Sequence, residues 1–264
     1  MKNSSILSTF LATSCSLSVL SIVAPTYAQI NVDTEISFLV DISGSVDSSE
    51  YDLQVNGYIN ALNNLDFTGT NFAANFIVWS GASQQEESVG WTHIFDNASA
   101  QNFATSISNA LLPENTERPF NGNTAPGSAI NFAIPLFGLE TGGADNGFIS
   151  NRQIIDVSGD GSENEGNNTA AARDAALLAG VDAINGLPIL TDDPNLDIWY
   201  QNNVIGGTGS FLQIANDFDD FESAITQKIT REIIRGVPEP SSVLGLIGVG
   251  VFAAKSLVKR SKSQ

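Results

Sequence analysis

Three oxygen-bearing side chains at alternating positions could bind a metal ion. Asp41, Ser43 and Ser45 lie in the stretch Asp-Ile-Ser-Gly-Ser-Val-Asp (41–47), directly after an apolar run. Gly44 permits the backbone to curl, which would turn the carboxylate and both hydroxyls toward one point. Hard oxygen donors with few charges suit Mg²⁺ or Mn²⁺, which keep several waters and take one or two protein carboxylates. A loop that caps the following helix is the alternative interpretation.

The element before this loop places it where ligands bind in many sheets. The run Ile-Ser-Phe-Leu-Val (36–40) is rich in β-branched and aromatic residues, which indicates a strand buried on both faces. Open α/β sheets bind ligands outside the carboxyl ends of their strands. Asp41 is therefore expected at the ligand-binding end of a sheet.

Two later segments supply further oxygen donors. Thr124 precedes Pro126, which suits the first turn of a helix, so the Thr124 hydroxyl could reach over the sheet or cap that helix. Asp160 follows a strand predicted at 152–158. Carboxylates held close together at the ends of central strands, Asp41 and Asp160, would repel each other without a cation between them. This repulsion is the physical argument for a bound metal.

The pattern Asp-x-Ser-x-Ser, followed by a threonine and an aspartate from two later loops, resembles the metal-ion-dependent adhesion site (MIDAS) of von Willebrand factor type A domains. The resemblance covers essentially residues 32 to 236. It implies that Ser43, Ser45 and Thr124 hold Mg²⁺ or Mn²⁺, with Ca²⁺ less favoured, while Asp41 and Asp160 act largely through water. It also implies that a protein partner offers a carboxylate to the metal.

The strand end around Asp160 departs from the commonest family pattern. A hydrophobic residue, Thr or Ser, Asp and Gly are typical there, whereas this chain has Ser158-Gly159-Asp160. Asp156 lies on the same strand, about 13 Å before Asp160 at ~3.3 Å per residue, and we assign it a structural role. The stretch from Asp160 to Gly166 also resembles a calcium loop, but its glycine is one position late for an EF-hand.

The order of predicted elements indicates the fold class. Strands are predicted at 34–40, 71–80, 90–95 (an antiparallel edge), 152–158, 181–190 and 210–215, and helices from 48, at 97–112, after Pro126, at 168–179, around 196–200 and from 219. This alternation predicts a single α/β domain with a doubly wound, mostly parallel, six-stranded sheet flanked by helices, a Rossmann-like arrangement. The resemblance to von Willebrand factor type A domains implies that the first strand lies beside the fourth, with the metal where the strand order reverses.

Two helix ends carry specific expectations. Ser48 or Ser49 is a plausible cap for the first helix. The closing helix begins with acidic residues and ends with Lys228, Arg231 and Arg235, an order that complements the helix dipole.

Both ends of the chain read as sorting signals. Residues 1–28 carry Lys2, an apolar run and Pro-Thr-Tyr-Ala, which is typical of a secretory signal peptide cleaved after Ala28. A membrane anchor is the alternative, although Ser and Thr dilute the apolar run. The domain assignment is therefore a signal peptide at 1–28, a type A-like domain at 29–236 and a tail at 237–264.

The tail closely resembles the PEP-CTERM sorting signal. Pro-Glu-Pro at 238–240 is followed by an apolar run at 243–254, a marginal transmembrane helix, and then by a basic end. The resemblance implies recognition and cleavage by an exosortase-type enzyme after transient membrane anchoring. It implies export to the cell surface or extracellular matrix of a Gram-negative-type bacterium, with cyanobacteria included. A simple tail anchor is the alternative.

The composition excludes several classes of partner and site. Residues 29–236 carry 28 acidic and 6 basic side chains, which gives a net charge of 6 − 28 = −22. This charge argues against nucleic acid and anionic lipid as partners. The one cysteine, Cys15, lies in the predicted signal peptide, so the mature chain has neither a disulfide nor a thiolate site.

The predicted function is cation-dependent binding of a protein partner in cell adhesion or matrix assembly, without enzymatic activity. One alternative is a structural matrix protein whose metal site is unused. The other is a metal-assisted hydrolase with Glu163 or Glu165 as general base. No Ser-His-Asp set supports it, and His93, the one histidine, falls on a predicted edge strand.

Overall fold

A six-stranded sheet organises the molecule. The computed structural model describes residues 28–112 and 118–234. The strand order is β4-β3-β2-β6-β7-β8. The strands are β2 (Thr34–Asp41), β3 (Phe72–Trp79), β4 (Gln85–Ile94), β6 (Gln153–Gly159), β7 (Ala183–Pro188) and β8 (Gly206–Gly207). The central four are parallel, whereas β4 and β8 run antiparallel to their neighbours. The predicted α/β class and the placement of the first predicted strand beside the fourth are confirmed.

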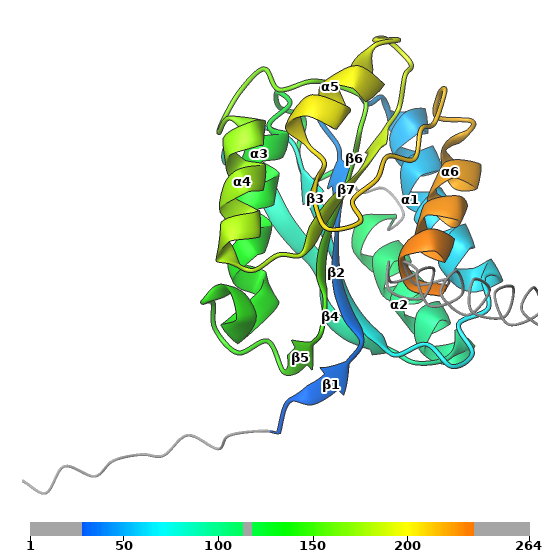
Figure 1. The fold of residues 1–264 in the computed structure, drawn as a ribbon. Helices are drawn as coiled ribbons and strands as arrows, with labels where there is room; N and C mark the ends of the chain where they lie inside the picture. Colours follow the sequence, from blue (N-terminus) through cyan, green and yellow to red (C-terminus); the bar gives the residue numbers. More distant parts are fainter. Residues whose placement is uncertain (1–27, 113–117, 235–264) are drawn as a thin grey trace, which may run out of the picture.

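Helices cover both faces of this sheet (Figure 1). One face carries α1 (Ser48–Asn64), α2 (Asn97–Leu111) and α6 (Phe221–Ile229), and the other carries α3 (Pro126–Ala133) and α4 (Thr169–Ala179). The short helix α5 (Leu196–Asn203) lies at the carboxyl end of the strands, at the top of Figure 1. A 3₁₀ helix (Ile134–Thr141) follows α3, and a π-helical turn (Thr230–Ile234) continues α6. At the opposite end, β1 (Ile30–Val32) pairs with β5 (Phe148–Ser150).

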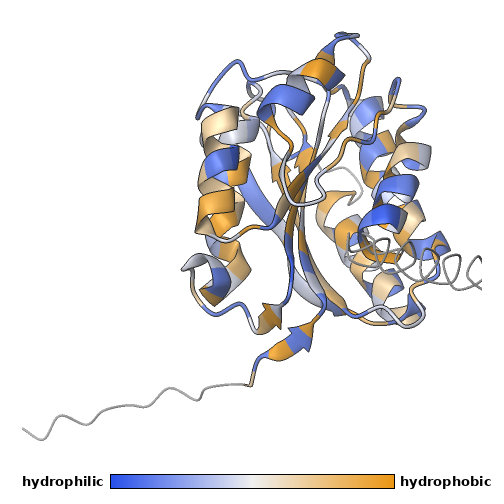
Figure 2. Cartoon of the chain, viewed as in Figure 1, coloured by the Kyte–Doolittle hydropathy of each residue, from blue (hydrophilic) through white to orange (hydrophobic). Residues whose placement is uncertain are grey.

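Alternation along the central strands divides the core into two layers. Phe38 and Val40 of β2 pack toward α1, α2 and α6, whereas Leu39 packs toward α3, α4 and α5. Figure 2 shows the same division, with hydrophobic residues on the strands and on the helix faces turned toward them. Because both faces are covered, the polar side chains on these strands are held in a dry interior.

The structure corrects two expectations about local structure. Helix α1 is capped by Asp47 in a capping box with Glu50, and not by Ser48 or Ser49. The segment 210–215 makes only isolated bridges to β7, because the chain pairs first at Gly206–Gly207 and then turns at Gly209, whose φ is 74°. Lys228 lies in the last turn of α6, as expected, and its side chain is buried.

Candidate metal centre

The loops after β2 and β6 and the loop before α3 meet at the carboxyl end of the sheet. Neighbouring strands bring the first two loops together, since Val40 of β2 pairs with Ser158 of β6. The third loop is tied to the first by a backbone hydrogen bond from Gly44 N to Gly122 O, 2.8 Å long. The five predicted site residues all lie on these loops or at the strand ends that lead into them.

Hydrogen bonds connect all five predicted residues. The amide of Ser43 donates to Asp41 Oδ1 at 2.8 Å, and the hydroxyls of Ser43 and Ser45 lie 3.2 Å apart. Ser45 Oγ donates to Asp160 Oδ1 at 2.8 Å, and Thr124 Oγ1 donates to Ser43 Oγ at 3.4 Å. One carboxylate, three hydroxyls and a second carboxylate therefore form a continuous cluster.

Thr124 does not cap helix α3. The N-cap position is Ala125, which makes no side-chain capping bond, and Pro126 occupies the first turn as predicted. Thr124 is 5% exposed, and its hydroxyl donates to Ser43 Oγ. Of the two interpretations left open by the sequence, the structure favours the one in which this hydroxyl joins the cluster.

The two carboxylates lie in an environment that disfavours their negative charge. Asp41 is fully buried and Asp160 is 4% exposed. Burial raises the pKa of Asp41, and the nearby charge of Asp160 raises it further. Burial also raises the pKa of Asp160, although the hydrogen bond from Ser45 acts in the opposite direction. A cation beside these groups would stabilise their ionised forms.

One oxygen of the Asp41 carboxylate accepts no hydrogen bond from the described part of the chain. Within residues 28–112 and 118–234, neither Asp41 Oδ2 nor the buried hydroxyl of Tyr200 has a hydrogen-bond partner. A Cβ atom added at Gly159 would lie 2.7 Å from Asp41 Oδ2 and 2.9 Å from the Tyr200 hydroxyl. Glycine at 159 therefore leaves the room that these two oxygens occupy.

Residues that sequence reasoning missed hold the loops in place. Gln54 Nε2 donates to the backbone carbonyl of Asp41 at 3.0 Å. Arg118 donates to the carbonyls of Ser43 and Val46. Asn164 Oδ1 accepts from the amide of Thr124 at 2.9 Å. The burial of Gln54 on α1, at a position that would otherwise be apolar, follows from this hydrogen bond.

Other candidate residues have structural partners. Glu163 accepts from the amide and hydroxyl of Thr169 in the first turn of α4, and Glu165 accepts from the amide of Ala82 at 3.3 Å. His93 Nε2 lies 2.8 Å from Asn71 Oδ1, near the amino end of β3. Both glutamates thus accept hydrogen bonds from neighbouring backbone, and His93 lies at the end of the sheet opposite the candidate centre.

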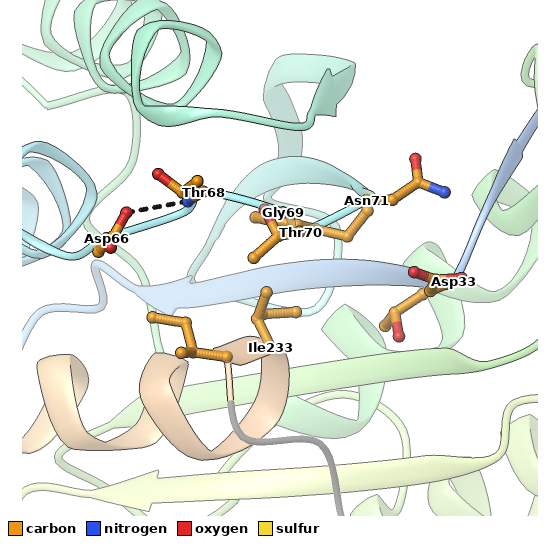
Figure 3. A pocket seen from close by; sticks show the side chains of 10 residues that line it. Asp33, Asp66, Thr68, Gly69, Thr70, Asn71 and Ile233 are labelled. Atoms are coloured by element: carbon orange, nitrogen blue, oxygen red, sulfur yellow. Dashed lines mark hydrogen bonds between the residues drawn. The ribbon is translucent and has the colours of Figure 1, made fainter.

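Two hollows flank the fold at opposite ends. One, of about 530 Å³, lies beside Gly44 and Gly122 at the candidate centre and includes Gln84 and Glu165 in its lining. The other, of about 170 Å³, lies at the amino ends of β2 and β3 (Figure 3). In this hollow, Asp66 Oδ1 accepts a hydrogen bond from the amide of Thr68 at 3.0 Å, which stabilises the turn. The acidic residues that line the hollow are Asp33 and Asp66.

The part of the chain that the structure describes contains no group of three or more His, Cys, Asp or Glu side chains that could hold a metal ion. A cation at the candidate centre would therefore need the hydroxyls as well as the two carboxylates. No helix in this part is long and apolar enough to cross a membrane. The predicted signal peptide, apart from Ala28, and the predicted tail lie outside the described residues.

Two family models match the chain. The model described as "Protein of unknown function (DUF1194)" matches residues 31–237. The chain belongs to this DUF1194 family. A second model, the PEP-CTERM protein-sorting motif, matches residues 236–261, which marks this DUF1194 protein as an exported protein recognised by an exosortase-type enzyme. A search of curated proteins returns no match.

Solved structures similar to this DUF1194 protein have the von Willebrand factor type A fold. Two structures of proximal thread matrix protein 1 from the mussel byssus align with TM-scores of 0.52 and 0.53, at 13% and 14% identity. The alignments cover 77% and 76% of this chain but 48% and 47% of the mussel protein, so the chain spans about half its length. A third structure of that protein, described as having a zinc-occupied MIDAS motif, aligns with a TM-score of 0.49.

Proposed function

We propose that this exported protein binds a protein partner through a divalent cation held by Asp41, Ser43, Ser45, Thr124 and Asp160. The observation that carries the proposal is the cluster itself. Three hydroxyls and two nearly buried carboxylates meet at the carboxyl end of the sheet, and one carboxylate oxygen, Asp41 Oδ2, has no partner among the described residues.

The donor set fits a hard divalent cation. Hydroxyl and carboxylate oxygens are ligands of Mg²⁺ and Mn²⁺, and two carboxylates match the small number of charged ligands that Mg²⁺ takes from proteins. In this proposal Ser43, Ser45 and Thr124 hold the ion directly, and Asp41 and Asp160 act largely through water. The raised pKa values of the two acids support the proposal. A cation would offset the cost of burying their negative charges and would reduce the repulsion between them.

The bound cation would supply a site for one more oxygen ligand. Because the protein would contribute mostly neutral hydroxyls, the ion would keep enough positive charge to attract a carboxylate of a partner. The domain itself is strongly acidic, with 28 acidic and 6 basic side chains in residues 29–236. An acidic partner would be repelled everywhere except at the cation, so the contact would be local and cation-dependent.

The same geometry argues against hydrolysis. Glu163 and Glu165, the two acids considered as general bases, accept hydrogen bonds from the backbone near Thr169 and Ala82. We therefore propose a binding module rather than an enzyme. Hydrolysis of a polymer substrate that disappears in Asp41→Ala would support the enzyme instead.

Thermal unfolding of the purified protein tests the cation site. The wild type and Asp41→Ala are compared in EDTA, Mg²⁺, Mn²⁺ and Ca²⁺. A cation at 100 times its dissociation constant should raise the free energy of unfolding by about 2.7 kcal/mol. We expect that gain for the wild type in Mg²⁺ or Mn²⁺ and its loss in the variant. Equal behaviour of both proteins in every cation would contradict the proposal and favour a structural matrix protein.

A second measurement tests the partner. Isolated extracellular matrix from the producing cells is incubated with the protein in Mg²⁺ or in EDTA, and the retained fraction is measured. We expect retention in Mg²⁺ that falls in EDTA and in Asp41→Ala. Equal retention of the wild type in Mg²⁺, of the wild type in EDTA and of Asp41→Ala would mean that binding does not use the cation.

A further inference from the structure

A second cluster of charged side chains is buried between the sheet and the last helix. Asp156 lies on the central strand β6, Lys228 on α6 and Glu232 in the π-helical turn that follows. The side chains of Asp156 and Lys228 are fully buried, and Glu232 is 3% exposed. None of the three belongs to the candidate metal centre.

The lysine contacts both acids, but in different ways. Lys228 Nζ donates to Glu232 Oε1 at 2.8 Å, and Asn185 Nδ2 donates to the same oxygen at 2.7 Å. Lys228 Nζ also contacts Asp156 Oδ1. This contact is an ion pair between two fully buried side chains. The amine nitrogen of Lys228 is therefore held directly against the Asp156 carboxyl group.

The surroundings of the cluster are apolar. Phe38 pairs with Asp156 across β2 and β6, and the ring of Phe211 lies 5.7 Å from Lys228 Nζ. Arg231 stacks on Phe211 with its guanidinium 3.6 Å from the ring centre, which covers this side of the cluster. Water is thus largely excluded, and three ionised groups in such a place carry a large desolvation cost.

The charges of the cluster do not balance. Two carboxyl groups face one amine, so full ionisation would leave a net negative charge in the core. Burial raises the pKa of Asp156, and the charge of Glu232 raises it further, whereas Lys228 lowers it. The burial that raises the pKa of Asp156 favours its neutral carboxylic acid form, which is the form that an amine can attack to give an amide.

We infer that Lys228 and Asp156 are joined by an intramolecular amide bond, with Glu232 moving the proton. The nitrogen Nζ attacks Cγ of Asp156, a C–N bond forms and one C–O bond breaks. Starting from an ammonium and a carboxylate, the nitrogen gives up two protons and the carboxylate one oxygen, which leave together as one water molecule. No oxidant, reductant or other reactant is needed.

Glu232 is placed to carry the proton. Its Oε1 already accepts from Nζ, so it can take a proton from the attacking nitrogen and pass it to the oxygen that leaves Asp156. The folded chain holds the reacting groups in contact, which replaces a bimolecular encounter by a positioned one. The product keeps the hydrogen bond to Glu232 and removes two charges from the core.

Peptide mapping of the wild-type protein tests the bond directly. Between 153 and 231, trypsin can cleave after Arg173, Lys228 and Arg231, and an acylated lysine is not cleaved. We expect one branched product in which peptide 153–173 is attached to peptide 174–231, lighter by one water than the sum of the two. Fragmentation should place the branch at Asp156 and Lys228.

Two other results would overturn the inference. Free peptides 153–173 and 174–228 at their full masses would mean that the cluster is an ordinary buried ion network. A linear peptide 153–173 lighter by one water would mean that Asp160-Gly161 had dehydrated to a succinimide instead. The map distinguishes these outcomes from the branched product without any variant.

Variants test the role of each residue. Glu232→Gln removes the proton carrier, and we expect most of the branched peptide to be replaced by free 153–173. Lys228→Met removes the nucleophile but keeps a long apolar side chain, and we expect complete loss of the branched peptide. Glu222→Gln, on the exposed face of the same helix, is the matched control and should leave the branch intact. A full yield of branch in Glu232→Gln would contradict the role given to Glu232.

Discussion

Ser45 and Asp160 are 115 residues apart in the chain, yet the hydroxyl of Ser45 donates a 2.8 Å hydrogen bond to the carboxylate of Asp160. The bond joins the loop after β2 to the loop after β6. Since these strands are paired in the centre of the sheet, the two loops are fixed relative to each other before any ligand binds. A cation would meet a site that is already assembled, so little ordering cost would oppose its binding.

The Ser45 hydroxyl should matter more with a cation than without. Ser45→Ala removes the hydrogen bonds of an exposed hydroxyl to Ser43 and Asp160, so we expect a loss of about 1 kcal/mol in EDTA. In Mg²⁺ the loss should be larger, because a proposed ligand is also missing. Thermal unfolding in both conditions measures this difference, with Ser48→Ala on the neighbouring exposed turn as control. Equal losses in EDTA and Mg²⁺ would remove Ser45 from the ligand set.

Gly159→Ala should displace the Asp41 carboxylate in the candidate metal centre. The added methyl would lie 2.7 Å from Asp41 Oδ2, so the carboxylate must shift. We expect a loss of about 1–3 kcal/mol in the free energy of unfolding, as for other overpacked positions, together with a weaker response to cations. Gly90→Ala is the control, because nothing lies within 4 Å of a Cβ atom there. An unchanged cation response would show that the position of Asp41 Oδ2 is unimportant.

Asp47→Ala should separate helix capping from cation binding. Asp47 accepts from the amides of Ser49 and Glu50 at the start of α1, and removing such a cap costs about 1 kcal/mol. Asp47 is not a proposed ligand, so the stabilisation by Mg²⁺ should stay within error of the wild type. Isothermal titration with Mg²⁺ checks this, and a large loss of affinity would extend the ligand set to Asp47.

Glu35 should make stability depend on pH. Its carboxyl is buried on β2 and accepts from Asn146 Nδ2 at 2.6 Å, and burial, with the charge of Glu140 as a smaller contribution, raises the pKa of Glu35 above 4.5. A group whose pKa is raised by folding stabilises the protein fully below its unfolded pKa, and this contribution is lost as pH rises through the folded value.

Glu35→Gln cannot ionise, so it should not lose that contribution. We expect the stability of the variant relative to the wild type to increase as pH rises above about 4.5. Denaturant unfolding between pH 4 and pH 8, spanning about four units around the ordinary titration range, measures the trend. A difference that stays constant across this range would mean that Glu35 is not protonated preferentially in the folded protein.

The sequence predicted the central sheet well because its strands are long and apolar. Residues 36–40 are apolar apart from Ser37, residues 152–158 contain Ile154, Ile155 and Val157, and both segments became central strands. The spacing of Asp41, Ser43 and Ser45 predicted the cluster for the same reason, since a strand end fixes where the following loop lies. These features depend on local pattern, which a sequence shows directly.

The errors arose where distant contacts decide the structure. The chain pairs with β7 through β8 and not through residues 210–215, and this depends on the turn at Gly209. Gln54 and Arg118 donate to loop carbonyls that only the folded chain brings near them. The position of Lys228 in the sequence indicates that its side chain is buried. It lies on the apolar stripe of Phe221, Ala224 and Ile225 at helical spacing, which indicates a buried charge that needs a partner.

The contact between Lys228 and Asp156 also bears on how the protein would carry tension. The sorting motif begins at residue 236, so a pull from the carboxyl-terminal side would enter the domain through α6 and the turn after it. With the proposed amide bond in place, this load would pass from Lys228 directly into the central strand β6 at Asp156, and residues 157–227 would lie outside the loaded path. A domain linked in this way would resist detachment of its last helix under tension. Asp160 of the candidate metal centre lies in the unloaded segment, so the centre would keep much of its geometry under shear.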